Sequence, residues 1–296
     1  MKISISLKRW LWGLVVFLWL VPYPALARPL IIGSVGDDQA SEIKKFLPFA
    51  RYLAKQLQSA EIDDDKVAVA KDFSQMAAML RDGKVDLYID SPFPAVAASR
   101  LSGSKFLLRR WKKGVGEYHS VIFVRKDSGI NQMEELKGKQ IAFESPSSSS
   151  GYFLPKLAMT QAGLKLVGQK NPSPNEVAYL FSEEDENTMW WVIKGKVTAG
   201  AMDQANFEQE AKGEIGQLKI LHKTFSIPRQ IVSHRADLSE PLVAKIKQVL
   251  TQMDKSEEGK KTLQAFERTA KFDELTAQSM APLVQQHKLI DAELGK

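Results

Sequence analysis

Cysteine is absent from the 296-residue sequence, and histidine occurs only four times. The lack of cysteine excludes disulfide bonds, thiolate metal sites, a cysteine nucleophile and a lipid anchor attached through cysteine. The histidines are scattered at His119, His222, His234 and His287, and none forms an i,i+4 pair. A zinc enzyme is therefore not indicated. The sequence also lacks a GxxxxGK[ST] motif and a GxSxG motif, which argues against a nucleotide-hydrolysing P-loop and an α/β-hydrolase elbow. We expect neither a cofactor nor a metal.

Long hydrophobic runs are also scarce, and only residues 10–21 (WLWGLVVFLWLV) form one. Lys2, Lys8 and Arg9 precede this run, and the small residues Ala25 and Ala27 follow it. That order predicts a secretory signal peptide, residues 1–27, cleaved after Ala27. The alternative is a retained membrane anchor, but a spanning helix needs about twenty apolar residues. We expect a mature protein in the periplasm that is monomeric and does not span the membrane.

The charge balance does not indicate a nucleic-acid-binding protein. The formal net charge is +6 for the whole chain, and removal of residues 1–27 lowers it to +3 because three of the basic residues lie there. No basic run is long enough for a nucleic-acid surface. The hydrophobic fraction of 44% excludes a disordered chain.

The mature chain alternates short apolar strands with amphipathic helices, which predicts an α/β fold with mostly parallel sheets covered by helices on both faces. The alternation restarts after Arg125, so we predict two lobes. The first lobe is discontinuous (residues 28–119 plus 228–296) and the second spans residues 120–227. The predicted strands are 30–35, 66–70, 85–89, 105–111, 120–125, 140–143, 197–202, 218–221 and 230–233, and the predicted helices include 41–58, 73–81, 92–101, 151–162, 175–181, 188–193, 204–211, 238–253, 257–269 and 273–287.

In such sheets the ligand lies beyond the carboxyl ends of the strands, so the residues that follow each strand are the site candidates. The strongest of them are four serines and Gly151 between a predicted strand and a predicted helix. Serine hydroxyls and the first N–H groups of a helix can bind an oxyanion. The alternatives are an over-capped helix start and a flexible serine linker. The full set of candidates is Asp37, Asp90, Ser91, Tyr118, Ser148, Ser149, Ser150, Gly151, Tyr152 and Asp203.

Three motifs add a resemblance to a known family. Tyr118–Ser120, the EELKGK turn at 134–139 and SSSGYFLP at 148–155 together resemble the periplasmic phosphate/phosphite/phosphonate-binding proteins of ABC transporters. The resemblance covers roughly residues 29–235. It implies the type II periplasmic binding protein fold, with two α/β lobes, two crossing segments and a cleft between the lobes.

The same resemblance implies roles for individual residues. Ser148, Ser149 and Ser150 would grip the oxyanion with help from the N–H of Gly151. Tyr118 would bond a ligand oxygen, and Asp203 would lie near a ligand amine.

The chain also departs from the family pattern. The family's frequent Ser-His pair is replaced by SEEDEN at 182–187. The family's gPxxY element reads DSPFPA at 90–95, so an aromatic hydroxyl is missing and an acid is added. A zwitterionic ligand, with its cation facing Asp90 or Asp203, suits these changes. We interpret the acids at 183–186 as a solvated helix start, with a ligand or cation site as the alternative. We interpret the basic cluster at 109–113 as a solvated sheet edge, with an anion-attracting patch as the alternative.

These observations favour an exported, non-enzymatic receptor that closes on a small phosphorus oxyanion or an aminoalkylphosphonate-like ligand and delivers it to an ABC permease. One alternative is a ligand-sensing partner of a membrane histidine kinase. A distant alternative is an enzyme on the same scaffold, with the serine loop as nucleophile.

Overall fold

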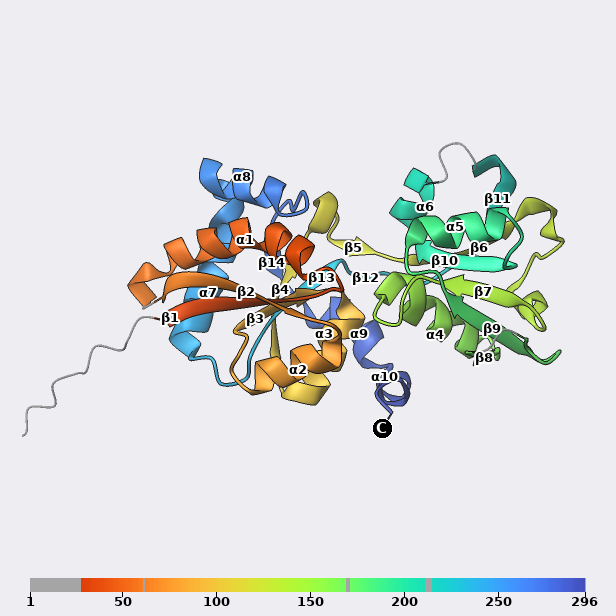
Figure 1. Ribbon diagram of the computed structural model, residues 1–296, viewed down its shortest axis with the longest axis horizontal. Helices are drawn as coiled ribbons and strands as arrows, with labels where there is room; N and C mark the ends of the chain where they lie inside the picture. Colours follow the sequence, from red (N-terminus) through yellow and green to blue (C-terminus); the bar gives the residue numbers. More distant parts are fainter. Residues whose placement is uncertain (1–27, 61, 169–170, 211–214, 296) are drawn as a thin grey trace, which may run out of the picture.

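The computed structural model describes residues 28–295 apart from residues 61, 169–170 and 211–214, and it contains two six-stranded sheets (Figure 1). The predicted signal peptide lies outside the described residues. Each sheet forms one lobe with its helices, so the predicted two-lobe α/β architecture is confirmed. Among the described residues, no helix has the length and apolar character needed to cross a bilayer.

The first sheet has the order β14-β4-β13-β3-β1-β2. Strands β2, β1 and β3 run parallel, whereas β13, β4 and β14 are added antiparallel. Its strands are β1 (Arg28–Val35), β2 (Ile62–Ala70), β3 (Leu87–Asp90), β4 (Lys105–Arg110), β13 (Gln230–His234) and β14 (Phe272–Glu274). Helices α1 (Gln39–Gln56), α7 (Glu240–Gln252) and α8 (Glu257–Ala265) contribute to the core on one side, and α2 (Phe73–Arg81) and α3 (Pro92–Ser102) to a second core cluster.

The second sheet has the order β11-β6-β10-β7-β9-β8. Its strands are β6 (Ser120–Arg125), β7 (Gln140–Phe143), β8 (Lys165–Val167), β9 (Glu176–Phe181), β10 (Ala199–Asp203) and β11 (Leu218–Lys223). Helix α4 (Leu154–Gln161) packs in one core cluster, and α5 (Asp185–Ile193) with α6 (Gln204–Glu210) packs in another.

Two short strands, β5 (Glu117–Tyr118) and β12 (Ile227–Pro228), pair antiparallel where the chain passes between the lobes (Figure 1). The chain therefore crosses from one lobe to the other twice at this ribbon. The predicted lobe boundaries lie at the same place and stay a prediction.

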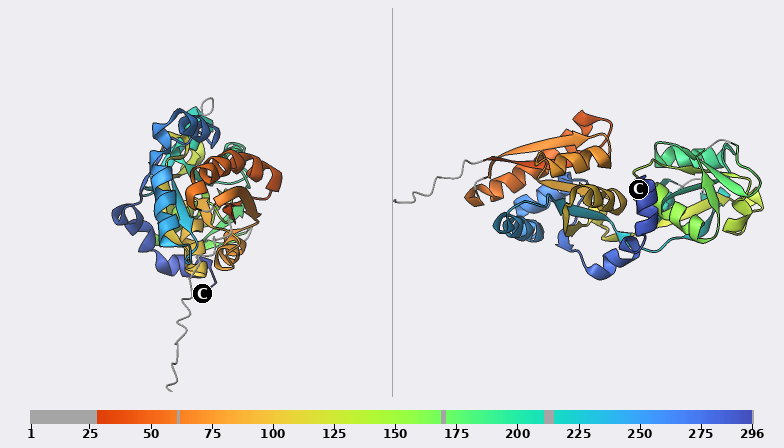
Figure 2. Two further views of the ribbon diagram at one scale, coloured as in Figure 1. Left: turned by 90° about the vertical axis from the view of Figure 1, so that its left-hand side faces the viewer. Right: turned by 90° about the horizontal axis from the view of Figure 1, so that it is seen from below.

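The C-terminal helices α9 (Ala277–Val284) and α10 (His287–Glu293) lie at the junction of the lobes, as Figure 2 also shows. Met280, Leu283 and Ile290 join a buried cluster with Phe93 of the first lobe and Phe153 of the second. The Phe93 and Phe153 rings stack with centroids 4.3 Å apart.

Several predicted elements are wrong. Residues 175–181 were predicted as a helix, but Glu176–Phe181 is strand β9, because Val177, Tyr179 and Phe181 favour a strand and a short apolar run carries no clear period. The predicted helix 273–287 is divided into β14, α9 and the start of α10. The basic cluster at 109–113 is not at an edge, since β4 lies between β13 and β14 and Arg110 is completely buried.

Candidate ligand-binding site

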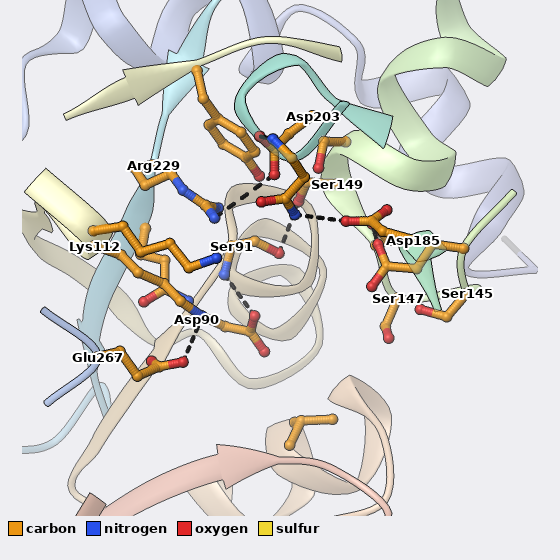
Figure 3. Close-up of a pocket in the computed structure, with 18 residues that line it drawn as sticks. Asp90, Ser91, Lys112, Ser145, Ser147, Ser149, Asp185, Asp203, Arg229 and Glu267 are labelled. Atoms are coloured by element: carbon orange, nitrogen blue, oxygen red, sulfur yellow. Dashed lines mark hydrogen bonds and ion pairs between the residues drawn. The ribbon is translucent and has the colours of Figure 1, made fainter. Parts of the chain in front are cut away.

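A cavity of about 330 Å³ lies where the carboxyl ends of strands from both sheets converge (Figure 3). Val35 and Asp90 end strands of the first sheet, Asp203 ends β10 of the second, and Glu144 follows β7. The cavity is lined mainly by hydroxyl and charged side chains. The lining residues are Val35, Asp90, Ser91, Lys112, Lys113, Tyr118, Glu144, Ser145, Ser147, Ser148, Ser149, Ser150, Asp185, Asp203, Asn206, Arg229, Gln230 and Glu267.

The serine loop enters the cavity as a π-helical turn, Ser149–Phe153, that leads into α4. Ser148 caps this turn, because its Oγ accepts a hydrogen bond from the N–H of Gly151 at 2.8 Å. The same Oγ donates to Oε2 of Glu144 at 2.6 Å. The hydroxyl of Ser120, the first residue of β6, also fixes the loop by donating a hydrogen bond to the carbonyl of Ser150 at 2.6 Å. The loop is therefore fixed by bonds that do not involve a ligand.

Ser149 connects the two lobes. Its Oγ accepts from the N–H of Phe93 at 2.9 Å and donates to Oγ of Ser91 at 2.9 Å. Pro92 and Pro94 flank Phe93, and proline has no N–H to offer. The first turn of α3 therefore has few main-chain donors left for an anion, and recognition from the first lobe depends on side chains.

Three cationic side chains from the first lobe and the ribbon line the cavity: Lys112, Lys113 and Arg229. Figure 3 shows Lys112 and Arg229 on one side of the cavity and Asp185 with Ser145 and Ser147 on the other. The guanidinium of Arg229 lies over the ring of Tyr118 at 4.3 Å and its Nη2 is 3.9 Å from Oδ2 of Asp203. These contacts orient Arg229 toward the cavity.

Lys112 is held by Glu267, with Nζ and Oε1 2.8 Å apart. Burial lowers the pKa of Lys112, although Glu267 partly offsets that effect. Burial alone would raise the pKa of Glu267, but Lys112 and then Arg110 hold it at about 2. Glu267 is therefore ionised at neutral pH and positions the Lys112 ammonium.

Asp90, which is half-buried, and Tyr118, which is buried, both line the cavity. Burial raises the pKa of Asp90, and hydrogen bonds from the Tyr88 hydroxyl and the Ser91 N–H, both 2.6 Å long, work against that rise. Burial also raises the pKa of Tyr118 to about 12, so its phenol keeps its proton and can donate to a ligand.

The opposite side of the cavity holds two acids, Glu144 and Asp185. Burial raises the pKa of Glu144, although the Ser148 hydroxyl opposes the shift. Burial and then the charge of Glu144 raise the pKa of Asp185 to about 7. Oδ2 of Asp185 accepts from Nδ2 of Asn206 at 2.6 Å, whereas Oδ1 is buried without a hydrogen-bond partner.

Most of the predicted site residues line this cavity, and three do not. Ser148, Ser149, Ser150, Tyr118, Asp203, Asp90 and Ser91 belong to the lining. Asp37 is exposed beyond the end of β1. Tyr152 is directed into the core of the second lobe, where its hydroxyl donates to Glu293 at 2.8 Å. Gly151 gives its N–H to Ser148, and a Cβ at this position would lie 2.5 Å from Cβ of Glu144. Its small size therefore allows the close packing of the loop against Glu144.

Six charged residues of the lining are not among the candidates predicted from the sequence: Lys112, Lys113, Glu144, Asp185, Arg229 and Glu267. Lys112 and Lys113 are interpreted from the sequence as part of a solvated edge, with an anion-attracting patch as the alternative, but they follow β4, which has a neighbouring strand on each side. Asp185 is interpreted from the sequence as part of a solvated helix start, with a ligand or cation site as the alternative, and its side chain lines the cavity. Arg229 directly follows β12, the second strand that crosses between the lobes. In the sequence, its position just after Pro228, at the predicted lobe boundary, is the signal that could have identified it.

Comparisons with known proteins agree with this geometry. A family model described as "ABC transporter, phosphonate, periplasmic substrate-binding protein" matches residues 33–280. The sequence is 22% identical over 233 residues to the phosphate-import protein PhnD of Mycolicibacterium smegmatis, which covers 75% of this chain and 71% of that protein. It is 24% identical over 246 residues to the phosphonates-binding periplasmic protein of Escherichia coli, covering 80% of this chain and 70% of that protein.

Solved structures show the same fold. XAC2383 from Xanthomonas citri bound to chloride ion superposes with a TM-score of 0.83 at 25% identity, covering 90% of this chain and 99% of that chain. PhnD1 from Prochlorococcus marinus in complex with methylphosphonate has a TM-score of 0.67 at 22% identity, covering 90% and 98%. The family resemblance inferred from the three motifs is confirmed by the family model, which matches most of the chain.

Proposed function

Because the chain belongs to the family of periplasmic phosphonate substrate-binding proteins of ABC transporters, we propose that it captures a small phosphorus oxyanion by lobe closure and delivers it to a membrane permease. One observation carries this proposal. The serine loop of the second lobe and the cations Lys112 and Arg229 face the same cavity from opposite sides. A tetrahedral anion between them would contact both lobes and so favour their closed arrangement.

The donor set suits a charged oxyanion. The loop hydroxyls and the Tyr118 phenol supply neutral donors, and Lys112 and Arg229 supply charged ones. Hydrogen bonds to charged groups contribute about 1.5–3 kcal/mol each. The small volume of the cavity suits a ligand with few heavy atoms, such as phosphate, phosphite or a short phosphonate.

An aminoalkylphosphonate is less well supported than an amine-free oxyanion. Asp203 already has Arg229 near its carboxylate, and both oxygens of Asp90 accept hydrogen bonds from Tyr88 and Ser91. A ligand amine would have to displace one of these partners.

We propose that the leader is cleaved after Ala27 and that the mature protein is a monomer in the periplasm. We also propose that its first lobe comprises residues 28–119 plus 228–296 and its second lobe residues 120–227. We also propose that the protein is not an enzyme, because no histidine within the described residues lines the cavity to activate a serine hydroxyl. The alternative of a histidine-kinase partner would use the same cavity, and the family match favours transport.

The serine loop is the direct test. Replacing Ser149 and Ser150 together with alanine should raise the dissociation constant for phosphate, phosphite or methylphosphonate by about two to four decades. The reason is that two hydroxyl donors are lost, at about 1.5–3 kcal/mol for each bond to a charged ligand, where Ser149 exchanges its bond to Ser91 for one to the ligand. Isothermal titration calorimetry measures this change.

The control is the double variant Ser128→Ala/Ser173→Ala, which removes two exposed hydroxyls of the same lobe. It should bind like the unmodified protein. Unchanged affinity in the Ser149/Ser150 variant would show that the loop only caps a helix, and the proposed function would lose its main support.

A further inference from the structure

A second cavity, of about 240 Å³, adjoins the one described above. Arg268, which follows α8 in the first lobe, and Gln209 of α6, in the second lobe, line the second cavity but not the first. A ligand in the first cavity therefore has room to extend a substituent into the second, where it would contact both lobes. The two cavities have five lining residues in common: Lys113, Tyr118, Asp203, Asn206 and Arg229.

The two loops that carry Lys113 and Arg268 have a strained backbone. Non-glycine residues rarely adopt the left-handed conformation, yet φ is 54° at Lys113 and 52° at Arg268. Glu267, which positions Lys112 in the first cavity, also has a φ of 51°. The loops are joined by a hydrogen bond of 3.3 Å from the N–H of Lys113 to the carbonyl of Glu267. Strain of this kind clusters at ligand sites, and here it places two cations at one cavity.

The charges at the second cavity favour an anion. Asp203 faces Arg229, with Oδ2 and Nη2 3.9 Å apart, a contact drawn in Figure 3. Glu267 is paired with Lys112 as described above. Within the part of the chain that the structure describes, neither Lys113 nor Arg268 forms an ion pair with an acid. The second cavity therefore has two cations whose charge no described carboxylate balances.

We propose that Lys113 and Arg268 bind a second oxyanion group of the ligand, so that the protein prefers a phosphorus oxyanion joined through a short linker to a phosphate or a carboxylate. This inference rests on the proposed function and names the substrate class of the same site. The first group lies between the serine loop and Arg229, and the second lies between Lys113 and Arg268. Ammonium and guanidinium groups bind both kinds of oxyanion.

The experiment uses two pairs of probes that differ in the second group. Calorimetry on the full mature chain, at constant ionic strength, compares phosphonoacetate with methylphosphonate and diphosphate with phosphate. Since one hydrogen bond to a charged group corresponds to about ten- to hundredfold in affinity, we expect the doubly anionic member to bind at least about tenfold more tightly. A gain in only one pair supports the inference and identifies the second group as a carboxylate or a phosphate.

Arg268→Gln should reduce this preference to a few-fold and leave the affinity for methylphosphonate unchanged, because Arg268 does not line the first cavity. Arg268→Lys retains a cation and should retain most of the preference. Arg268→Gly removes the charge and also relieves the backbone strain, because glycine adopts a positive φ without steric cost. Loss of the preference in Arg268→Gly is therefore not explained by misfolding.

Lys261→Gln is the matched control. It removes one exposed cation from α8, the helix that precedes Arg268, and Lys261 lines neither cavity. The preference should persist in this variant. An equal loss in Lys261→Gln and Arg268→Gln would show that the preference reflects the overall charge of the protein, and the inference would be wrong.

Two further outcomes overturn the inference: equal affinities within both pairs of probes, and an unchanged preference in folded Arg268→Gln and Arg268→Gly. The test also separates this inference from the proposed function. If phosphate or methylphosphonate binds and the Ser149/Ser150 variant abolishes binding, the proposed function stands whatever the second cavity does. If no phosphorus oxyanion binds the unmodified protein, both fail.

Discussion

At the scale of single residues, the acid pair Glu144 and Asp185 should make stability depend on pH. Burial raises the pKa of Asp185 from 3.8 when exposed to about 7 in the folded protein. Between these two values the folded state holds more protons than the unfolded state. Stability therefore falls as the pH rises through this window. Glu144 and Asp90 are shifted in the same direction by burial.

Asp185→Asn should remove this contribution. We expect the ligand-free variant to gain stability relative to the unmodified protein as the pH rises from about 4 to 7, and to keep the gain above pH 7. Urea unfolding at a series of pH values measures the difference. Glu186→Gln should show no such trend. A difference that is constant across the pH range would mean that Asp185 is not a buried acid in solution.

Glu267 makes stability depend on pH in the opposite direction. Lys112 and Arg110 hold its pKa at about 2 despite burial, so its stabilising effect is present at neutral pH. That effect is lost only as the pH falls below about 4 toward 2. Asp185 and Glu267 therefore affect stability in different pH ranges. The comparison with Asp185→Asn measures the contribution of Asp185 alone.

At the scale of elements, the π-helical turn at Ser149–Phe153 depends on Gly151. A methyl group there would lie 2.5 Å from Cβ of Glu144 and 2.9 Å from Oγ of Ser148. We expect Gly151→Ala to destabilise the protein by about 1–3 kcal/mol through overpacking and to weaken phosphate binding, because the loop must shift. Thermal unfolding and calorimetry measure the two effects.

Gly216→Ala is the control for this change. Gly216 has open space where its Cβ would lie and no unfavourable backbone angle, so the substitution should leave both stability and binding unaltered. If Gly151→Ala behaves like Gly216→Ala, the turn tolerates a larger residue and does not fix the hydroxyls.

The elements also show how far the sequence alone could lead. The alternation of strands and helices predicted both lobes, and the rule of carboxyl ends located Asp90, Ser148–Ser150 and Asp203 together. The rule failed for Tyr152, because a position just after a strand does not reveal which way a side chain points once a helix begins. The rule could not identify Lys112 or Arg229 as site residues. They follow an antiparallel strand and a crossing strand, and the partners of these strands are known only from the folded structure.

At the scale of the whole molecule, α10 joins the two lobes by charged contacts. Asp291 pairs with Arg100 of α3, on the first lobe. Glu293 pairs with Lys156 of α4, on the second lobe, and accepts from the Tyr152 hydroxyl at 2.8 Å. Lys156 and Glu293 are about 15% exposed, so their ion pair is well shielded from solvent. The last helix therefore lies across the junction with one acid on each lobe.

This arrangement predicts that Glu293 supports the closed state that binds the ligand. Opening about the β5–β12 ribbon should separate α10 from α4, and Glu293→Gln should make that opening easier. The apparent dissociation constant for phosphate then rises in proportion to the loss of the closed population, about tenfold for each 1.4 kcal/mol. Calorimetry measures this rise, and small-angle X-ray scattering should show a larger radius of gyration without ligand.

The matched control is Glu274→Gln, which breaks the exposed Lys247–Glu274 pair within the first lobe. Exposed ion pairs contribute little, and this pair does not connect the lobes, so affinity and radius should stay unchanged. If Glu293→Gln lowers the melting temperature but alters neither the affinity nor the radius, α10 is only a packing element. The closing force would then have to come from the Ser149 bonds to α3 and from the ligand itself.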